Sequence, residues 1–534
     1  MGPVLLLMML AAENSEVTAT PPEHSTGLKF VVAFPENIAY YHPVVAQNMV
    51  QLTALYDDTS VNIKSYTFAD IEMTLSQGES KNYTLDERME SNSQSISDRV
   101  LQITSNNLIT VHAINQKQNS VQTALVLPTD KLAKEYLIPP VPEIQGTTLP
   151  VNIVTAGVTE RGPFRLVIVN GENAGNIVTV KGTNDEKFTL ESNHIVQIWL
   201  GKTEQFRSVT ASYPVAVLFG HTCAMRSSCI CGQLYAALPP AKEEKLKFYI
   251  PPALANGTEA FVLVSEKTGT KIQDFNPASP LVETAGTAIF YHQGLLLPLI
   301  PDTDFAACYV VHSILDTQNF VFIVVNKTFT DGVHVGNLRL ENSWQDLKGT
   351  DYVSTTVVLV LGKSVIWHAS SKMAVYFMGR KNGSWFGNPA AIISTSPDFR
   401  GCVLSPEVLK IGEVANSWQE SLKYCKDQKM ELVSFPEAQH QREVYGKLLQ
   451  AQGASRQEVW IGMRRSSRSG EWYWLNGVPV NDTNWEEGEP GTVHDGQCAI
   501  MSLDENKNFG WSDKGCCEAA KPVCHIEPIL LNIS

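Results

Sequence analysis

The chain has 534 residues, of which 43% are hydrophobic and 18% are charged, and its formal net charge is -14. A chain of this length exceeds a single core, so several domains are expected, and the ordinary composition excludes wholesale disorder. The acidity and the lack of a basic cluster argue against nucleic acid or an anionic membrane as partner.

The N-terminus begins with an apolar run, residues 4–12, which ends in small residues. We interpret residues 1–20 as a signal peptide and lead-in; the alternative is an ordinary native N-terminus, since the run is short and lacks Lys and Arg. No later stretch approaches the roughly 20 apolar residues of a membrane span, so no transmembrane segment is expected. Sequons of a secreted glycoprotein occur at Asn82, Asn256, Asn326, Asn382, Asn481 and Asn532.

The ten cysteines form an even set, which predicts a disulfide framework and an extracellular location. The tight group Cys223, Cys229 and Cys231 has a metal site as its alternative. A second ligand pair at finger-like spacing is lacking, and this favours disulfides. The pairing of these three cysteines and of Cys308 stays open.

Residues 27–398 consist of short runs rich in Val, Ile, Leu, Tyr and Phe, broken by Gly, Pro, Asn and Asp, which predicts strands. The runs recur: residues 108–113 resemble 214–219 and 372–377, residues 136–140 resemble 248–252, and residues 166–170 resemble 322–326. The repeats predict β units near 27–145, 146–246 and 320–398, with a shorter one at 247–319. We expect antiparallel β-sandwiches stacked in a row.

Within these repeats, the segments His221-Thr222-Cys223 and Leu238-Pro239-Pro240, with Cys231 between them, carry a further resemblance. Together with the strand pattern, they resemble the N-terminal domain of the IgG Fc-binding protein family. In that family the domain accompanies adhesive, mucus-type or matrix proteins. The resemblance therefore implies binding or assembly, and it leaves open whether this chain binds IgG.

No enzyme motif stands out in the chain. Gly201-Lys202-Thr203 and Gly362-Lys363-Ser364 look like the ends of phosphate-binding loops, but the earlier glycine of such a loop is missing in both. We interpret both as turns. The sequence shows no nucleophile elbow, zinc-protease helix or paired catalytic carboxylates, so the chain is predicted not to be an enzyme.

In the last quarter of the chain the sequence pattern changes from strands alone to a mixture of helices and strands. Ser417 and Glu420 form a capping box, and a second helix is expected after Ser434, from Pro436 to Gly453. Buried strands are expected at 460–463 and 471–475. The order of helix cysteine, W-I-G, a G-E-P loop, W-x-D-x-x-C and a terminal cysteine resembles the C-type lectin fold, which implies an α+β domain over residues 399–526.

The resemblance implies two disulfides, Cys425 with Cys524 and Cys498 with Cys516. Two cysteines are additional to that pattern. Because neighbouring cysteines rarely bridge each other, we expect Cys517 to pair with Cys402 rather than with Cys516.

Calcium-dependent sugar binders of this fold hold Ca²⁺ with carboxylate and amide oxygens that also bond sugar hydroxyls. The resemblance implies a Ca²⁺-binding set of Glu489, Asp495, Ser512 and Asp513, with Glu489 and Asp513 also contacting the ligand. Gly491 and Ser512 stand where amide ligands are expected, and Asp495 is displaced by one position. Since Ca²⁺ needs about six to eight oxygens, the alternative is that Glu489 and Asp513 only stabilise their loop.

Two functions therefore stay open. One is a secreted lectin that recognises a glycan or glycoprotein from an adhesive β scaffold. The other is a calcium-independent adhesion or matrix protein that binds another protein, in an Fc-binding-like manner. In both, the tryptophans at 472, 474, 485 and 511 are predicted to be core residues rather than sugar-stacking surfaces.

Overall fold

The computed structural model describes residues 25–39, 45–65, 68–91, 96–142, 164–200, 207–227, 230–255, 259–292, 294–435, 437–452, 457–492 and 496–532. The chain divides into two compact units. The first, here the β unit, runs to Val403 and includes the residues from Leu531 onward, and the second, here the α+β unit, is Leu404–Leu530. The prediction of a mostly β chain that ends in an α+β domain is confirmed.

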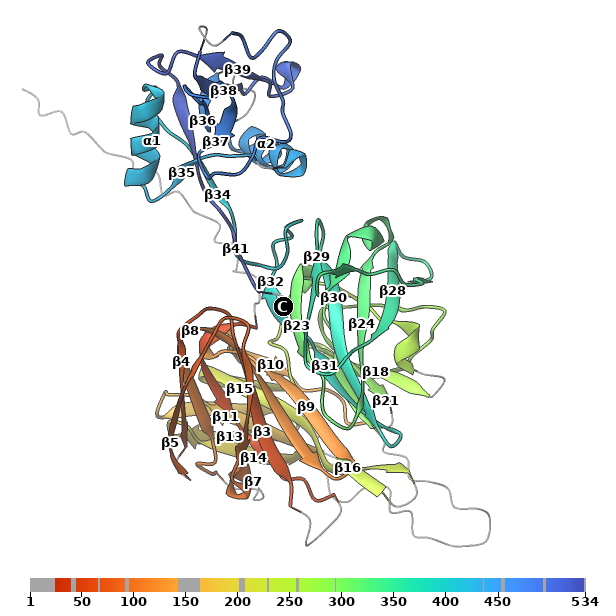
Figure 1. Ribbon diagram of the computed structural model, residues 1–534. Coiled ribbons are helices and arrows are strands. Elements are labelled where there is room, and N and C mark those ends of the chain that lie inside the picture. The colour runs from red at the N-terminus through yellow and green to blue at the C-terminus, as the bar shows by residue number, and fades with distance from the viewer. Residues whose placement is uncertain are drawn as a thin grey trace, which may run out of the picture. The chain divides into compact units, whose positions relative to one another are not determined.

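The first repeat of the β unit is organised around one long strand, β8 (Figure 1). The first half of β8 pairs with β1 and β4, and the second half pairs with β3 and β9, all antiparallel. Its strands are β1 (Gly27–Val32), β3 (Gln47–Ala54), β4 (Thr59–Ser65), β5 (Phe68–Leu75), β6 (Ser80–Leu85), β8 (Leu101–Lys117) and β9 (Ser120–Val126), with the short parallel pair β2 (Phe34–Pro35) and β7 (Glu90–Ser91).

The second repeat copies this topology around β15. The first half of β15 pairs with β10 and β12, and its second half pairs with β11 and β16. The strands are β10 (Ala133–Leu137), β11 (Phe164–Asn170), β12 (Asn176–Lys181), β13 (Glu186–Leu190), β14 (Ile195–Leu200), β15 (Ser208–Ser227) and β16 (Ile230–Ala237). The boundary predicted at 145/146 was wrong, because β10 pairs with β15 and so belongs to the second repeat.

The third repeat is smaller. A four-stranded sheet runs in the order β19-β18-β21-β22, and a separate pair joins β17 to β20. The strands are β17 (Leu246–Tyr249), β18 (Ala260–Glu266), β19 (Gly269–Asp274), β20 (Leu281–Thr284), β21 (Gly286–His292) and β22 (Leu295–Pro298). Their buried side chains share one core with Phe322 and Tyr376 of the fourth repeat. This repeat therefore depends on its neighbour to bury its apolar face.

The fourth repeat is a sandwich of two five-stranded sheets, in the orders β26-β25-β29-β23-β32 and β27-β28-β24-β30-β31. Gly362, one of the two false phosphate-loop ends, lies in the bend before β29, as expected of a turn. The strands are β23 (Cys308–His312), β24 (Gln318–Asn326), β25 (Val333–Val335), β26 (Leu338–Arg339), β27 (Gln345–Asp346), β28 (Tyr352–Val358), β29 (Lys363–His368), β30 (Met373–Lys381), β31 (Ser384–Pro389) and β32 (Ala391–Ser394).

The sequence predicts repeats stacked in a row, but the repeats of the β unit are not arranged in this way. Strand β9 contacts two other repeats at once: Gln122 Nε2 donates a 2.7 Å hydrogen bond to the carbonyl of Tyr235, and Thr123 Oγ1 lies 2.6 Å from Asn388 Oδ1. These buried polar contacts are satisfied only when the second and fourth repeats both pack against the first. The repeats therefore form one compact unit.

The α+β unit has two helices beside a sheet in the order β34-β40-β36-β38-β39. The capping box of Ser417 and Glu420 starts α1 as predicted, while Pro436 and Gly453 lie outside the described residues. The elements are β33 (Val403–Ser405), β34 (Val408–Ile411), α1 (Trp418–Asp427), β35 (Glu431–Leu432), α2 (Ala438–Gln452), β36 (Glu458–Arg465), β37 (Trp472–Trp474), β38 (Cys498–Ser502), β39 (Trp511–Lys514), β40 (Lys521–Ile526) and β41 (Ile529–Leu530).

Four disulfides are present among the described residues: Cys223–Cys231, Cys308–Cys402, Cys425–Cys524 and Cys498–Cys516. The expected Cys402–Cys517 bond was wrong. Cys402 lies beside β23, where its Cα is 5.5 Å from that of Cys308, within bridging range. Cys517 is left as an exposed free thiol, and Cys229 lies outside the described residues.

Candidate functional site

Glu489 and Asp513 reach the same edge of the α+β unit from different segments. Asp513 lies in β39, and Glu489 lies in the loop between β37 and β38. Backbone hydrogen bonds fasten this loop to the strand: the Trp511 N–H donates to the Asn484 carbonyl at 2.7 Å, and the Glu486 N–H donates to the Trp511 carbonyl at 2.8 Å. The loop position is therefore set by main-chain contacts to β39 rather than by the acidic residues themselves.

The two carboxylates are joined by a short network. The backbone N–H of Asp513 donates to Glu489 Oε2 at 3.4 Å, and the backbone N–H of Gly491 donates to Asp513 Oδ1 at 3.1 Å. The side-chain contact with Asp513, and then burial, raise the pKa of Glu489. Two like charges held this close favour either a shared proton or a bound cation.

One oxygen of the pair has no partner. Asp513 is 8% exposed, and its Oδ2 is buried without a hydrogen-bond partner among the described residues. A buried carboxylate oxygen without a partner costs free energy, and a cation at this position would remove that cost. In charge and in its unpaired oxygen, the Glu489–Asp513 pair fits a cation such as Ca²⁺.

The number of oxygens is smaller than a full calcium shell requires. Ser512 is 9% exposed beside Asp513, and Asp495 lies outside the described residues. No group of three His, Cys, Asp or Glu side chains in the described part of the chain is arranged to hold a metal ion. Two carboxylates supply at most four of the roughly six to eight oxygens of Ca²⁺, so backbone carbonyls, water or the ligand would have to supply the rest.

A guanidinium that the sequence reasoning missed lies beside this pair. Arg465, at the end of β36, donates from Nη1 to the carbonyl of Gly491 at 3.2 Å and from Nε to the carbonyl of Gly470 at 3.0 Å. This positive charge at the carbonyl of Gly491 opposes a cation on that side of the loop. No spacing signal marked Arg465, because the strand and the loop meet only in the fold.

The tryptophans near the site are mainly structural. Trp474 and Trp511 are 0% exposed and lie in the core, which confirms their predicted role. Trp472 and Trp485 are half-buried, with their ring centroids 4.9 Å apart, and Trp485 also contacts Trp511. The packing of these aromatic rings therefore helps to hold the loop that contains Glu489.

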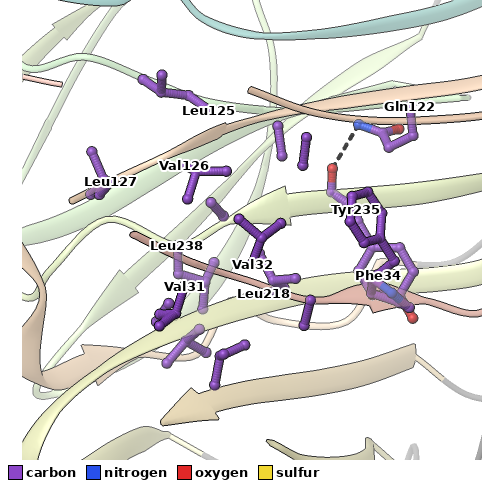
Figure 2. Close-up of a pocket in the computed structure, with 18 of the residues that line it drawn as sticks. Val31, Val32, Phe34, Gln122, Leu125, Val126, Leu127, Leu218, Tyr235 and Leu238 are labelled. Carbon is purple, nitrogen blue, oxygen red and sulfur yellow. Dashed lines mark hydrogen bonds between the residues drawn. The ribbon is translucent and has the colours of Figure 1, made fainter. Parts of the chain in front are cut away.

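The β unit contains a second candidate, an apolar cavity of about 70 Å³ between the first and second repeats. Figure 2 shows Val31, Val32, Leu218 and Leu238 around it, with Gln122 directed at the carbonyl of Tyr235. No charged side chain is among its described lining residues. A sugar would leave most of its hydroxyls unpaired here, so this cavity does not fit a glycan.

Comparison with known families divides the chain in the same way. Residues 414–526 match the Lectin C-type domain, and residues 122–294 match the IgGFc binding protein family. Human IgGFc-binding protein is 24% identical over 380 residues, which cover 62% of this chain and 7% of that protein. The chain thus spans a small part of that relative.

Among lectin relatives, human C-type lectin domain family 17, member A is 32% identical over 111 residues, which cover 20% of this chain and 26% of that protein. C-type lectin lectoxin-Phi1 of Philodryas olfersii is 27% identical over 110 residues, which cover 20% of this chain and 69% of that protein. The solved structure of human lithostathine is 24% identical, covers 23% of this chain and 92% of that chain, and has a TM-score of 0.21. The chain therefore combines an IgGFc-binding protein-like β region with a C-terminal C-type lectin domain.

Proposed function

We propose that this chain is an extracellular, non-catalytic recognition protein whose lectin domain binds a glycan or glycoprotein at the Glu489–Asp513 edge, with the β unit as an adhesive scaffold. The observation that carries the proposal is the pair of adjacent carboxylates with the unpaired Asp513 Oδ2. Four disulfides support an oxidising compartment. None of the described helices has the length and apolarity needed to cross a bilayer.

In this proposal Glu489 and Asp513 would hold the calcium ion. When bound, the ion would supply coordination positions for two neighbouring sugar hydroxyls, and these hydroxyls would donate hydrogen bonds to the same carboxylates. The Trp485 ring and the backbone bonds to Trp511 hold the loop in place, so little ordering is required on binding.

The test is a glycan array probed with the full chain in calcium and again in EDTA. We expect a signal in calcium that EDTA removes, and the same loss in the Glu489→Gln and Asp513→Asn variants. Glu487→Gln is the matched control, because Glu487 is an exposed acid in the same loop and its removal leaves the pair intact. A signal that survives both variants would contradict the proposed site.

A second candidate is calcium-independent binding of another protein, in an Fc-binding-like manner. It is favoured by the Gly491 N–H, which already occupies Asp513 Oδ1, and by the Arg465 guanidinium on the carbonyl of Gly491. The Gly491 N–H occupies an oxygen that a calcium ion would need, and the Arg465 guanidinium occupies a carbonyl that could otherwise serve as a calcium ligand. Retention on immobilised IgG Fc or a matrix glycoprotein that persists in EDTA, with no calcium-dependent glycan signal, would support this candidate instead.

A further inference from the structure

Two turns meet at one end of the fourth repeat. Residues 313–317 join β23 to β24, and residues 359–362 join β28 to β29; the four strands are labelled in Figure 1. Because β23 pairs with β29 and β24 pairs with β28, both turns cross between the two sheets at the same end. The Ser313 N–H donates to the carbonyl of Gly362 at 3.0 Å, and the Gly362 N–H donates to Ser313 Oγ at 2.6 Å. The two turns therefore form one tip with a fixed shape.

This tip exposes far more apolar surface than its folding requires. One side chain from each turn, Ile314 and Leu359, is buried in the core of the fourth repeat and anchors the turn. Four other aliphatic side chains of the tip are 68–77% exposed: Leu315, Val358, Val360 and Leu361. They are four of the five most exposed large hydrophobic side chains in the described part of the chain. Single exposed apolar residues are ordinary, whereas a group of them marks an interaction site.

The size of the tip argues against a protein as its partner. A stable protein–protein interface takes about 20–30 residues from each side, whereas the tip offers four aliphatic side chains on two turns. A lipid surface requires less, because attachment scales with the apolar area that enters the bilayer, and even one acyl chain gives reversible binding. Since the turns are already ordered by their mutual hydrogen bonds, little entropy is lost on insertion. A small, rigid apolar tip therefore fits a lipid surface.

The charges at the tip define the kind of lipid. Asp316 is the only charged residue in segments 313–317 and 358–362, and the whole chain has a formal net charge of -14. The next cation along the chain, Lys363, donates from Nζ to the carbonyl of Gly78 at 2.9 Å, so it is held against the first repeat. An anionic surface would repel both Asp316 and the chain, whereas the quaternary ammonium of choline attracts an acid. The tip is therefore complementary to a zwitterionic lipid.

We propose that this tip inserts into a zwitterionic lipid surface, such as one of phosphatidylcholine. Leu315, Val360 and Leu361 enter the boundary between the headgroups and the acyl chains, and Asp316 stays at the level of the choline groups. The attachment is peripheral and reversible, because only side chains of two turns enter the lipid. The inference does not depend on the proposed glycan site, which belongs to the α+β unit.

Flotation of the full chain with phosphatidylcholine vesicles in EDTA tests the proposal, since such vesicles carry no glycan and EDTA removes calcium. We expect the parent chain to float with the vesicles. The double variant Val360→Ser, Leu361→Ser should lower the partition coefficient about 100-fold, because burial of each such side chain is worth about tenfold or more. The control double variant Val45→Ser, Ile272→Ser removes exposed aliphatic side chains from the first and third repeats and should float as the parent does. Circular dichroism should show all three chains folded alike, because only exposed side chains change.

Two further measurements locate the contact and its charge preference. Leu361→Trp should retain flotation, since tryptophan favours the membrane interface, and lipids with brominated acyl chains should quench its fluorescence beyond that of the parent. Vesicles that also contain phosphatidylserine should bind the parent chain more weakly. No flotation of the parent, an equal loss in the control variant, or stronger binding to phosphatidylserine would overturn the proposal. Self-association of the parent without lipid that the double serine variant abolishes would assign the tip to a second copy of the chain instead.

Discussion

The hydroxyl of Tyr136 donates a 2.6 Å hydrogen bond to the backbone carbonyl of Val215, 79 positions further along the chain. In the fourth repeat, the hydroxyl of Tyr309 bonds in the same way to the carbonyl of Met373, also at 2.6 Å. Each hydroxyl also accepts a 3.0 Å bond from the N–H three residues before it. In both repeats, one tyrosine thus joins the first strand to the strand that corresponds to β8.

Replacement of this tyrosine should destabilise the β unit without disturbing the lectin domain. Tyr136→Phe leaves a buried carbonyl and a partly buried N–H without the tyrosine hydroxyl as partner, and we expect a loss of about 1–3 kcal/mol in the free energy of unfolding. Urea denaturation followed by far-ultraviolet circular dichroism measures the change. Tyr213→Phe is the control, since Tyr213 is 44% exposed, and its curve should overlay the parent curve. Equal effects of the two substitutions would contradict the structural role of Tyr136.

Acid should weaken the contact between the first and fourth repeats. His312 Nε2 lies 2.9 Å from Thr53 Oγ1, and the rings of His112 and His312 are 6.2 Å apart. Burial lowers the pKa of His112 to about 4, and burial with the neighbouring His112 and Lys363 lowers that of His312 to about 3. In the unfolded chain both titrate near 6.5, so the unfolded state binds more protons as the pH falls below that value.

The stability is therefore complete above about pH 6.5 and declines below it. Each histidine should remove about 1.4 kcal/mol per pH unit, down to about pH 4 for His112 and about pH 3 for His312. Urea denaturation between pH 7.5 and pH 5 measures the slope, which the His112→Gln, His312→Gln double variant should flatten. His194→Gln should retain the slope, because His194 is not buried. An unchanged slope in the double variant would show that other groups control the acid response.

The disulfide between Cys308 and Cys402 should matter more than the free thiol of Cys517. The bond spans 94 positions, for which the chain-entropy model gives about 4–5 kcal/mol. Cys402→Ser should lower the midpoint of the calorimetric transition of the β unit. Cys517→Ser should leave both transitions unchanged and should remove a thiol that reacts with a maleimide in the native protein. Equal thermal effects of the two substitutions would contradict the observed pairing.

Calcium should stabilise the lectin domain through Asp513. If the cation binds the native state alone, calcium at ten times its dissociation constant adds about 1.4 kcal/mol. Asp513→Asn should remove this calcium-dependent shift of the melting temperature. Without calcium, the substitution should cost little, because it relieves the repulsion with Glu489 and leaves Oδ1 able to accept from Gly491. A shift that persists in Asp513→Asn would place the calcium elsewhere, and no shift in the parent chain would favour the calcium-independent candidate.

Local sequence patterns were enough to predict much of the fold. The capping box of Ser417 and Glu420 starts α1 as predicted, because the box depends only on residues three positions apart. The strand repeats were visible because β-branched and aromatic runs recur in register. The boundaries between the repeats could not be read from the sequence, because β10 can be assigned only from its pairing with β15, more than 70 positions further along the chain. Spacing also failed for Cys402, whose partner lies in a strand 94 positions earlier.

By itself, the sequence determined which residue types were present: the carboxylates at 489 and 513, the glycine that replaces an amide ligand at 491, and the repeated apolar runs. The tertiary structure alone decided what surrounds them. It placed Arg465 on the carbonyl of Gly491, left Asp513 Oδ2 unpaired, and buried Glu407 against His440 at 2.7 Å and Lys447 at 2.9 Å. The reason is physical: charge, hydrogen bonding and desolvation depend on distances through space, and a strand and a loop far apart in the chain set those distances only when they pack together.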